Sequence, residues 1–477
     1  MKKVCLLIFA VFLGFSAVAQ FELSVKIAGY PEGAKLSLGR YYADKQYFVD
    51  TAIFDQRRGA YVFKRAERLE GGMHILITYE NVPAEIIIDQ NQNFSIEMKY
   101  PEFGVDMKFI NSPENKIYQD YNTKTRPLYL EFEKMRREFD ALENKQSPEG
   151  EALAPKIRNV LDEIEKIKEK FMQDNPKHLM TVVFKAQRPV ETPLAPDNIP
   201  ENERQLWRYN HWKDNFFGNF DLTDDRLLRT PLFHAKLNEF LETVLSPHPD
   251  SIKFGIERLV EQTRNAPELF KYVVWYTVDK YQRSQIIGYD AIWVYLAKKY
   301  YVSGDAFWAS AAVVENFKTA IERYEPLLIG NRPVEFWCPD TNADRPNEGH
   351  RSVFEPKTRY TIVMFWEPNC GHCKRQMPLL RDFYNEKRKE LDFEVFAVCR
   401  DHDVERWREY IYANNITQWI NVNGKASNVK YDDLWDVHST PTVYVLDNQR
   451  RIVTKRIEVE QIEVFMRNWN ALYFGGK

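Results

Sequence analysis

The feature that most constrains this chain is a pair of cysteines, Cys370 and Cys373, placed between a strand-like segment and a helix-like segment. Residues 360–365 (YTIVMF) form an apolar run rich in β-branched and aromatic side chains, which predicts a buried parallel strand. Residues 374–389 contain good helix formers, with apolar side chains at helical spacing. The two cysteines are therefore expected where a strand passes into the first turn of a helix.

This position favours thiol chemistry. The N-terminus of a helix presents unpaired N–H groups and a partial positive charge, which stabilise a thiolate. We therefore predict that Cys370 is the exposed nucleophile and that Cys373, one turn further on, closes the disulfide. A zinc site usually needs two close pairs of ligands, and His372, Cys399, His402 and His438 do not supply a second pair. The spacing indicates a redox pair rather than a metal site or a structural bridge.

Three further features agree with this interpretation in order and spacing: Trp366 before the pair, Pro378 after it, and Ser439-Thr440-Pro441-Thr442 downstream. Together they resemble thioredoxin, and in particular envelope thioredoxin-like proteins of the TlpA/ResA type, from about residue 328 to the C-terminus. The resemblance implies a cis peptide at Thr440–Pro441 that faces the cysteines. It also implies that Trp366, Thr440 and Pro441 bind the client protein.

The chain departs from the family pattern at two positions. Thioredoxin has a buried aspartate where this chain has Met364, and ResA-like proteins have a glutamate where it has Gln376. Either carboxylate would help to move a proton during exchange. We expect Glu367, beside the motif, or solvent to take over this role.

The direction of the redox reaction is less constrained by the sequence. His372 and Lys374 carry positive charge near Cys370 and are predicted to lower its pKa. Gly371-His372 is also the dipeptide of the oxidising protein disulfide isomerases, whereas the surrounding module resembles reductases. We favour an exported reductase that acts on client proteins. A disulfide isomerase or oxidase, or a partner-binding scaffold that carries a thioredoxin module, remain the alternatives.

The N-terminus predicts export. Met1-Lys2-Lys3 is a short basic segment, residues 4–15 are apolar, and Ala17-Val18-Ala19 supplies a cleavage signal before Gln20. We therefore expect residues 1–19 to be a signal peptide and the mature protein to be in the periplasm. The expected electron donor or acceptor is a membrane protein, and no cofactor is predicted.

The mature chain gives further limits on partners and bonds. Loss of Lys2 and Lys3 changes the formal charge from −3 to −5, which argues against a nucleic-acid or DNA partner. Four cysteines remain, so the fold depends on its core rather than on a disulfide framework. Cys338 and Cys399 are expected to be inert buried thiols, with a bond between them as the alternative.

The chain is expected to be multidomain. Short alternating strands separated by turn residues predict an antiparallel β-sandwich over residues 20–110. Ser112 and Pro113 predict the start of a helix. Helical periodicity then predicts an all-α domain over 111–325, which includes a charged antiparallel helix pair. This domain is also where we would place a protein partner. Residues 326–477 are expected to form an α/β/α domain of the thioredoxin fold.

Overall fold

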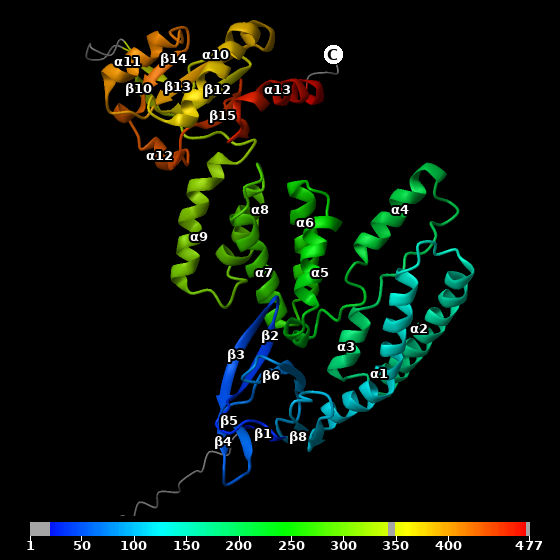
Figure 1. Ribbon diagram of the computed structural model, residues 1–477. Helices are drawn as coiled ribbons and strands as arrows, with labels where there is room; N and C mark the ends of the chain where they lie inside the picture. Colours follow the sequence, from blue (N-terminus) through cyan, green and yellow to red (C-terminus); the bar gives the residue numbers. More distant parts are fainter. Residues whose placement is uncertain (1–19, 342–348, 474–477) are drawn as a thin grey trace, which may run out of the picture. The chain divides into compact units, whose positions relative to one another are not determined.

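The computed structural model describes residues 20–341 and 349–473 (Figure 1). The predicted signal peptide, residues 1–19, lies outside the described residues. The chain divides into two compact units, one made of Met1–Leu245 and Glu261–Phe270 and the other of Ser246–Val260 and Lys271–Lys477. The boundaries that we predicted between three mature domains stay a prediction.

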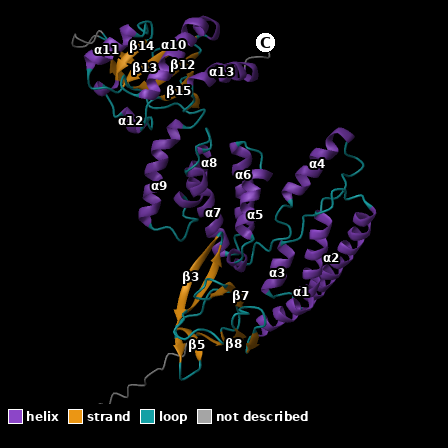
Figure 2. Cartoon of the chain, viewed as in Figure 1, coloured by secondary structure: helices purple, strands orange, loops and turns teal. Residues whose placement is uncertain are grey.

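The first unit begins with two β-sheets (Figure 2). One has the strand order β4-β5-β1-β8-β9 and the other β3-β2-β6-β7. Their inner faces share a core of apolar side chains that includes Leu23, Leu38 and Ile86, because apolar residues occupy alternate positions along the strands. The strands are β1 Phe21–Ala28, β2 Leu36–Tyr42, β3 Lys45–Ala52, β4 Phe54–Asp55, β5 Ala60–Arg65, β6 Gly72–Ile77, β7 Pro83–Ile88, β8 Asn93–Lys99 and β9 Lys108–Ile110.

One strand pair differs from the antiparallel arrangement that we expected. β1 and β8 run parallel, whereas every other pair described in these two sheets is antiparallel. Between β1 and β8 the chain forms all four strands of the second sheet as well as β4 and β5, and this long connection permits a parallel strand.

Helices follow the sheets. The predicted start is confirmed, because Ser112 is the N-cap and Pro113 the first residue of α1. The predicted charged pair corresponds to α1 and α2, which contact each other. On the outer face of the second sheet, Met73 and Ile87 pack with apolar side chains of the helices. These include Phe171 of α2 and Val183 of α3. The helices are α1 Pro113–Asp140, α2 Pro148–Asp174, α3 Leu179–Ala186, α4 Glu201–Asp214 and α5 Phe233–Glu239, which continues as a π-helical turn, Phe240–Val244.

A buried histidine makes the stability of this unit depend on pH. His74 in β6 is fully buried, and burial lowers its pKa to about 4, against the opposing effect of its contact with the Gly72 carbonyl. In the unfolded chain its pKa is about 6.5. Because the folded protein holds the ring in its neutral form, this contribution to stability is complete above pH 6.5. We expect the free energy of unfolding to fall by about 3 kcal/mol as the pH decreases from 6.5 to 4.

Urea unfolding between pH 7 and pH 4 measures this loss. His74→Gln cannot titrate at this position, so the difference between wild type and variant isolates the histidine from other groups. An equally steep loss of stability in the variant would contradict the assignment.

The second unit contains helices and an α/β region. Its helical part includes most of α6, Pro249–Gln262, and of α7, Pro267–Gln282. α8, Asp290–Leu296, continues as a π-helical turn, Ala297–Val302, and α9 spans Ala311–Tyr324. None of the helices in the described ranges is long and apolar enough to cross a lipid bilayer.

A five-stranded mixed sheet forms the centre of the α/β region, with the order β14-β13-β12-β15-β16. β12, β13 and β14 are parallel, and β15 and β16 are antiparallel to their neighbours. The elements are β10 Trp337–Pro339, β11 His350–Ser352, β12 Tyr360–Trp366, α10 Gly371–Leu391, β13 Phe393–Cys399, α11 Val404–Ala413, β14 Ile420–Asn423, α12 Tyr431–Leu434, β15 Thr442–Asp447, β16 Ile452–Lys455 and α13 Val459–Tyr473.

Both faces of this sheet are buried. Alternate residues of β12 face opposite sides: Ile362 and Met364 pack with side chains of α10, α11 and α13, and Val363 and Phe365 pack with Tyr431 of α12 and its neighbours. This explains why residues 360–365 are apolar at every position. The expected strand–helix–strand–helix order, closing hairpin and C-terminal helix are confirmed.

Candidate active site

Cys370 and Cys373 lie at the junction between β12 and α10, as predicted. Cys370 is the N-cap of α10, and its sulfur accepts a hydrogen bond from the Cys373 N–H at 3.4 Å. Its thiol donates to the Thr440 carbonyl oxygen at 3.2 Å. Cys370 is half-buried and Cys373 is buried, and both are free thiols. The two sulfurs thus differ in exposure at the start of one helix.

The same geometry separates the acidities of the two thiols. Burial raises the pKa of Cys370, but hydrogen bonds from the Thr440 side chain and from the backbone N–H groups of Cys373 and His372 outweigh it, so the pKa falls below its usual value. Burial raises the pKa of Cys373 to about 12. At neutral pH the arrangement therefore favours a thiolate on Cys370 and a thiol on Cys373.

The loop that faces the cysteines has the expected conformation, since the Thr440–Pro441 peptide is cis. Both residues are half-buried beside Cys370. Trp366 is different: its side chain is fully buried, with its ring centroid 4.9 Å from that of Tyr410. A role for these three residues in client binding stays a prediction, and Thr440 and Pro441 are the more accessible of them.

The two predicted tuning residues are exposed on α10. The His372 ring accepts a hydrogen bond from Arg375 at 2.8 Å between Nη2 and Nδ1. The His372 group that lowers the pKa of Cys370 is its backbone N–H. The helix terminus, more than the imidazole, therefore accounts for the acidity of Cys370.

The positions that depart from the thioredoxin pattern have their own partners. Gln376 is buried; its amide nitrogen lies 3.0 Å from a Glu460 carboxylate oxygen, and its carbonyl oxygen accepts from the Val459 N–H at 2.9 Å. Sequence reasoning missed Glu460, because it lies 84 residues further along the chain. Glu367 is half-buried and lies 3.8 Å from Arg400. The Glu460 carboxylate thus lies against Gln376, the residue at the position where ResA-like proteins have a glutamate.

The remaining cysteines are free and buried, as expected. Burial raises the pKa of both Cys338 and Cys399 to about 12. Cys338 packs in the cluster that contains Phe365, and Cys399 packs in the cluster that contains Met364, on the opposite face of the sheet. These positions do not allow the alternative bond between them.

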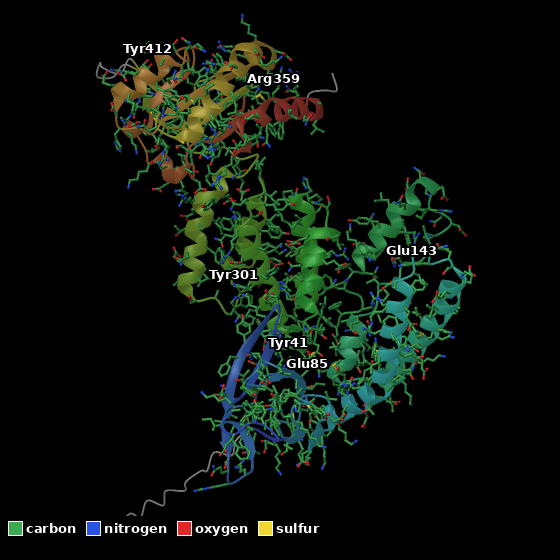
Figure 3. The ribbon with its side chains drawn as sticks, viewed as in Figure 1. Tyr41, Glu85, Glu143, Tyr301, Arg359 and Tyr412 are labelled. Atoms are coloured by element: carbon green, nitrogen blue, oxygen red, sulfur yellow. The ribbon has the colours of Figure 1, made fainter. Side chains whose placement is uncertain are left out.

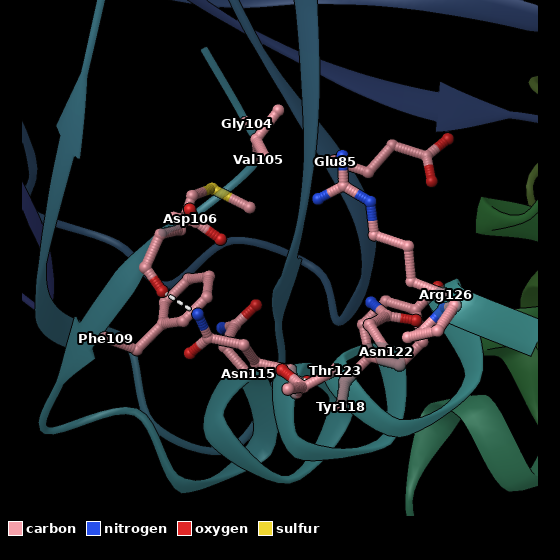
Figure 4. A pocket seen from close by; sticks show the side chains of 13 residues that line it. Glu85, Gly104, Val105, Asp106, Phe109, Asn115, Tyr118, Asn122, Thr123 and Arg126 are labelled. Carbon is pink, nitrogen blue, oxygen red and sulfur yellow. Dashed lines mark hydrogen bonds between the residues drawn. The ribbon is translucent and has the colours of Figure 1, made fainter. Parts of the chain in front are cut away.

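The first unit contains a pocket of about 200 Å³ between α1 and the segment before β9 (Figure 4). Two of its polar side chains have structural partners. Asn115 bonds the backbone N–H and carbonyl of Ile87, and Glu85 accepts from the Tyr41 hydroxyl at 2.9 Å (Figure 3). Within residues 20–341 and 349–473, no three His, Cys, Asp or Glu side chains are grouped so that they could hold a metal ion. The cysteine pair is therefore the strongest candidate for a reactive site.

Comparisons with known proteins match parts of this chain. A protein-family profile described as thioredoxin-like matches residues 358–452. No curated protein matches the chain. A domain of a possible thiol-disulfide isomerase from Cytophaga hutchinsonii is 29% identical over 31% of this chain and 96% of its own, with a TM-score of 0.28. A thioredoxin-like protein from Bacteroides caccae is 16% identical over 59% of this chain and 99% of its own, with a TM-score of 0.44.

The profile match coincides with the structure just described. It begins immediately before β12, includes both cysteines and the Thr440–Pro441 loop, and ends in β16. The β-rich and helical regions that precede it were expected from the sequence and are present. Residues 358–452 match the thioredoxin-like family profile, and the C-terminal region of this chain is a thioredoxin-like domain.

Proposed function

We propose that this protein is an exported thiol–disulfide oxidoreductase that exchanges disulfides with client proteins through Cys370 and Cys373, and that it works as a reductase in the periplasm. The observation that carries the proposal is the difference between the two thiols. Cys370 is accessible at a helix N-terminus with a lowered pKa, whereas Cys373 is buried behind it with a pKa of about 12. An attacking thiolate and a protected resolving thiol need this difference.

The reaction follows from these positions. The Cys370 thiolate attacks one sulfur of a client disulfide, which forms a mixed disulfide and releases the other client sulfur as a thiolate. Cys373 then loses its proton and attacks the Cys370 sulfur, which releases the second client thiolate and closes the Cys370–Cys373 disulfide. Two electrons pass from the dithiol to the client. We propose that a membrane donor returns two electrons to the protein for the next cycle.

Proton removal from Cys373 needs a base, because its pKa is far above neutral. Glu367 lies three residues before Cys370 and is half-buried. We assign it, or water that reaches the site, as the acceptor of this proton.

The reduction potential of the Cys370–Cys373 pair tests the proposal. Purified mature protein is equilibrated with dithiothreitol or glutathione, and the dithiol fraction is measured by thiol trapping. A value of about −270 mV supports a reductase, whereas a value between about −180 and −120 mV supports an oxidase or isomerase. The absence of a reversible couple would overturn the enzymatic function and favour a partner-binding scaffold.

A further inference from the structure

A buried carboxylate lies close to the redox site but outside it. The Asp436 side chain is 3% exposed, and the residue adopts a left-handed backbone conformation with φ 49°, which aspartate tolerates better than most residues. It follows α12 and comes four residues before Thr440. A charge this deeply buried requires partners.

The partners of Asp436 come from distant parts of the sequence. One carboxylate oxygen accepts from Arg323 Nη2 at 2.8 Å and from the Tyr324 hydroxyl at 3.1 Å. The other oxygen accepts from Arg456, which directly follows β16. Arg323 and Tyr324 are the last two residues of α9. The end of a helix that precedes the thioredoxin-like domain therefore binds a residue within that domain, inside one compact unit.

The same guanidinium makes a second contact two residues further along the chain, toward Thr440. Arg323 Nη2 lies 2.6 Å from His438 Nε2, so Arg323 holds two residues of the five-residue segment 436–440. This segment ends at Thr440, whose carbonyl oxygen accepts the hydrogen bond from the Cys370 thiol. Both contacts use the one Nη2 nitrogen, and His438 Nε2 also lies 3.0 Å from Asp436 Oδ1, so the guanidinium and the two residues form one cluster that restrains the segment.

We propose that Arg323 is a positioning residue for the redox site: by holding Asp436 and His438 it fixes segment 436–440, and thereby keeps Thr440 against the Cys370 sulfur. The proposal deepens the thiol–disulfide function proposed above and rests on it. It assigns α9 to the redox apparatus, although α9 lies before the family match. The hydrogen bond from the Thr440 side chain, which lowers the pKa of Cys370, depends on the same position.

The test compares Arg323→Gln and Asp436→Asn with wild type, all as the full mature chain. Reduced protein is alkylated with iodoacetamide across a pH series, and modification of Cys370 is followed by peptide mass spectrometry. Because a loosened Thr440 loses the side-chain hydrogen bond that lowers the pKa of Cys370, we expect alkylation at pH 7 to slow by about threefold to tenfold. The reduction potential should become more negative by about 15 to 30 mV, the equivalent of this change.

Lys318→Gln is the matched control. Lys318 is on the same helix, its side chain is 47% exposed, and its ammonium lies 3.5 Å from the Glu315 carboxylate in the adjoining turn. This variant should keep the wild-type pH profile and potential. Thermal unfolding of every variant shows whether it is folded, and Asp436→Asn decides the outcome if Arg323→Gln does not fold.

A wild-type alkylation rate and a wild-type reduction potential in a folded Arg323→Gln or Asp436→Asn protein would overturn the proposal. Equal changes of the rate and the potential in Lys318→Gln would overturn it as well. The failure of the proposed function has a different signature. It would appear in the wild-type protein itself, as the lack of a reversible Cys370–Cys373 couple, whereas failure of the positioning role leaves that couple intact.

Discussion

Cys370→Ala is expected to lose disulfide reduction of insulin by at least about a thousandfold, down to the rate of the dithiothreitol control. The reason is that Cys370 carries the accessible sulfur with the lowered pKa, whereas burial raises the pKa of Cys338, Cys373 and Cys399 to about 12. No second thiolate is therefore available at neutral pH to start the exchange. Insulin turbidity with dithiothreitol as the electron source measures the loss.

Two further variants define the roles of the cysteines. Cys338→Ala removes a buried thiol on the other face of the sheet and should keep full activity. Cys373→Ala should accumulate mixed disulfides with client proteins, since the step that resolves them is missing. Substantial insulin reduction by Cys370→Ala would show that the roles are wrongly assigned.

Lys455→Met is expected to lower the free energy of unfolding of the second unit by about 3 to 5 kcal/mol. The Lys455 ammonium in β16 binds the Asp290 carboxylate at the start of α8 and donates to the Leu327 carbonyl at 2.6 Å, with its side chain only 10% exposed. The other oxygen of Asp290 is buried without a hydrogen-bond partner. Loss of the lysine would leave this carboxylate with no compensating charge. Urea unfolding, followed by tryptophan fluorescence, measures the change.

A second substitution separates lost charge pairing from lost packing. Asp290→Asn combined with Lys455→Met removes both charges, so part of the lost stability should return relative to Lys455→Met alone. Lys318→Met, at an exposed ion pair, should change the free energy of unfolding by less than about 1 kcal/mol. An equally small effect of Lys455→Met would refute the buried ion pair as a major contribution.

The local sequence was enough to predict the elements that carry the cysteines. The apolar run at 360–365 is β12, and the helix expected after it is α10, whose first residue follows Cys370 directly. A strand that is buried on both faces leaves a continuous apolar run, and a helix start has its own local signals. The cis peptide implied by the resemblance is also present.

The contacts between residues far apart in the chain could not be predicted from local sequence patterns. Arg323 and Asp436 are 113 residues apart, and an arginine at a helix end otherwise reads as an ordinary solvated charge. The parallel pairing of β1 with β8 was missed for the same reason, since alternation along a strand does not specify its neighbour. α4 buries none of its residues, so it lacks the apolar face from which a helix is recognised.

The capping of α10 by a reactive sulfur has a consequence for how this protein can be observed. The Cys373 amide donates its hydrogen to the Cys370 sulfur, so the first turn of α10 is held most firmly when that sulfur carries charge. A bond from Cys370 to a client or to Cys373 removes the charge and weakens this cap. Deuterium uptake at the Cys373 amide should therefore rise on oxidation. Exchange at this single backbone position would then report the fractions of oxidised and reduced protein in a sample.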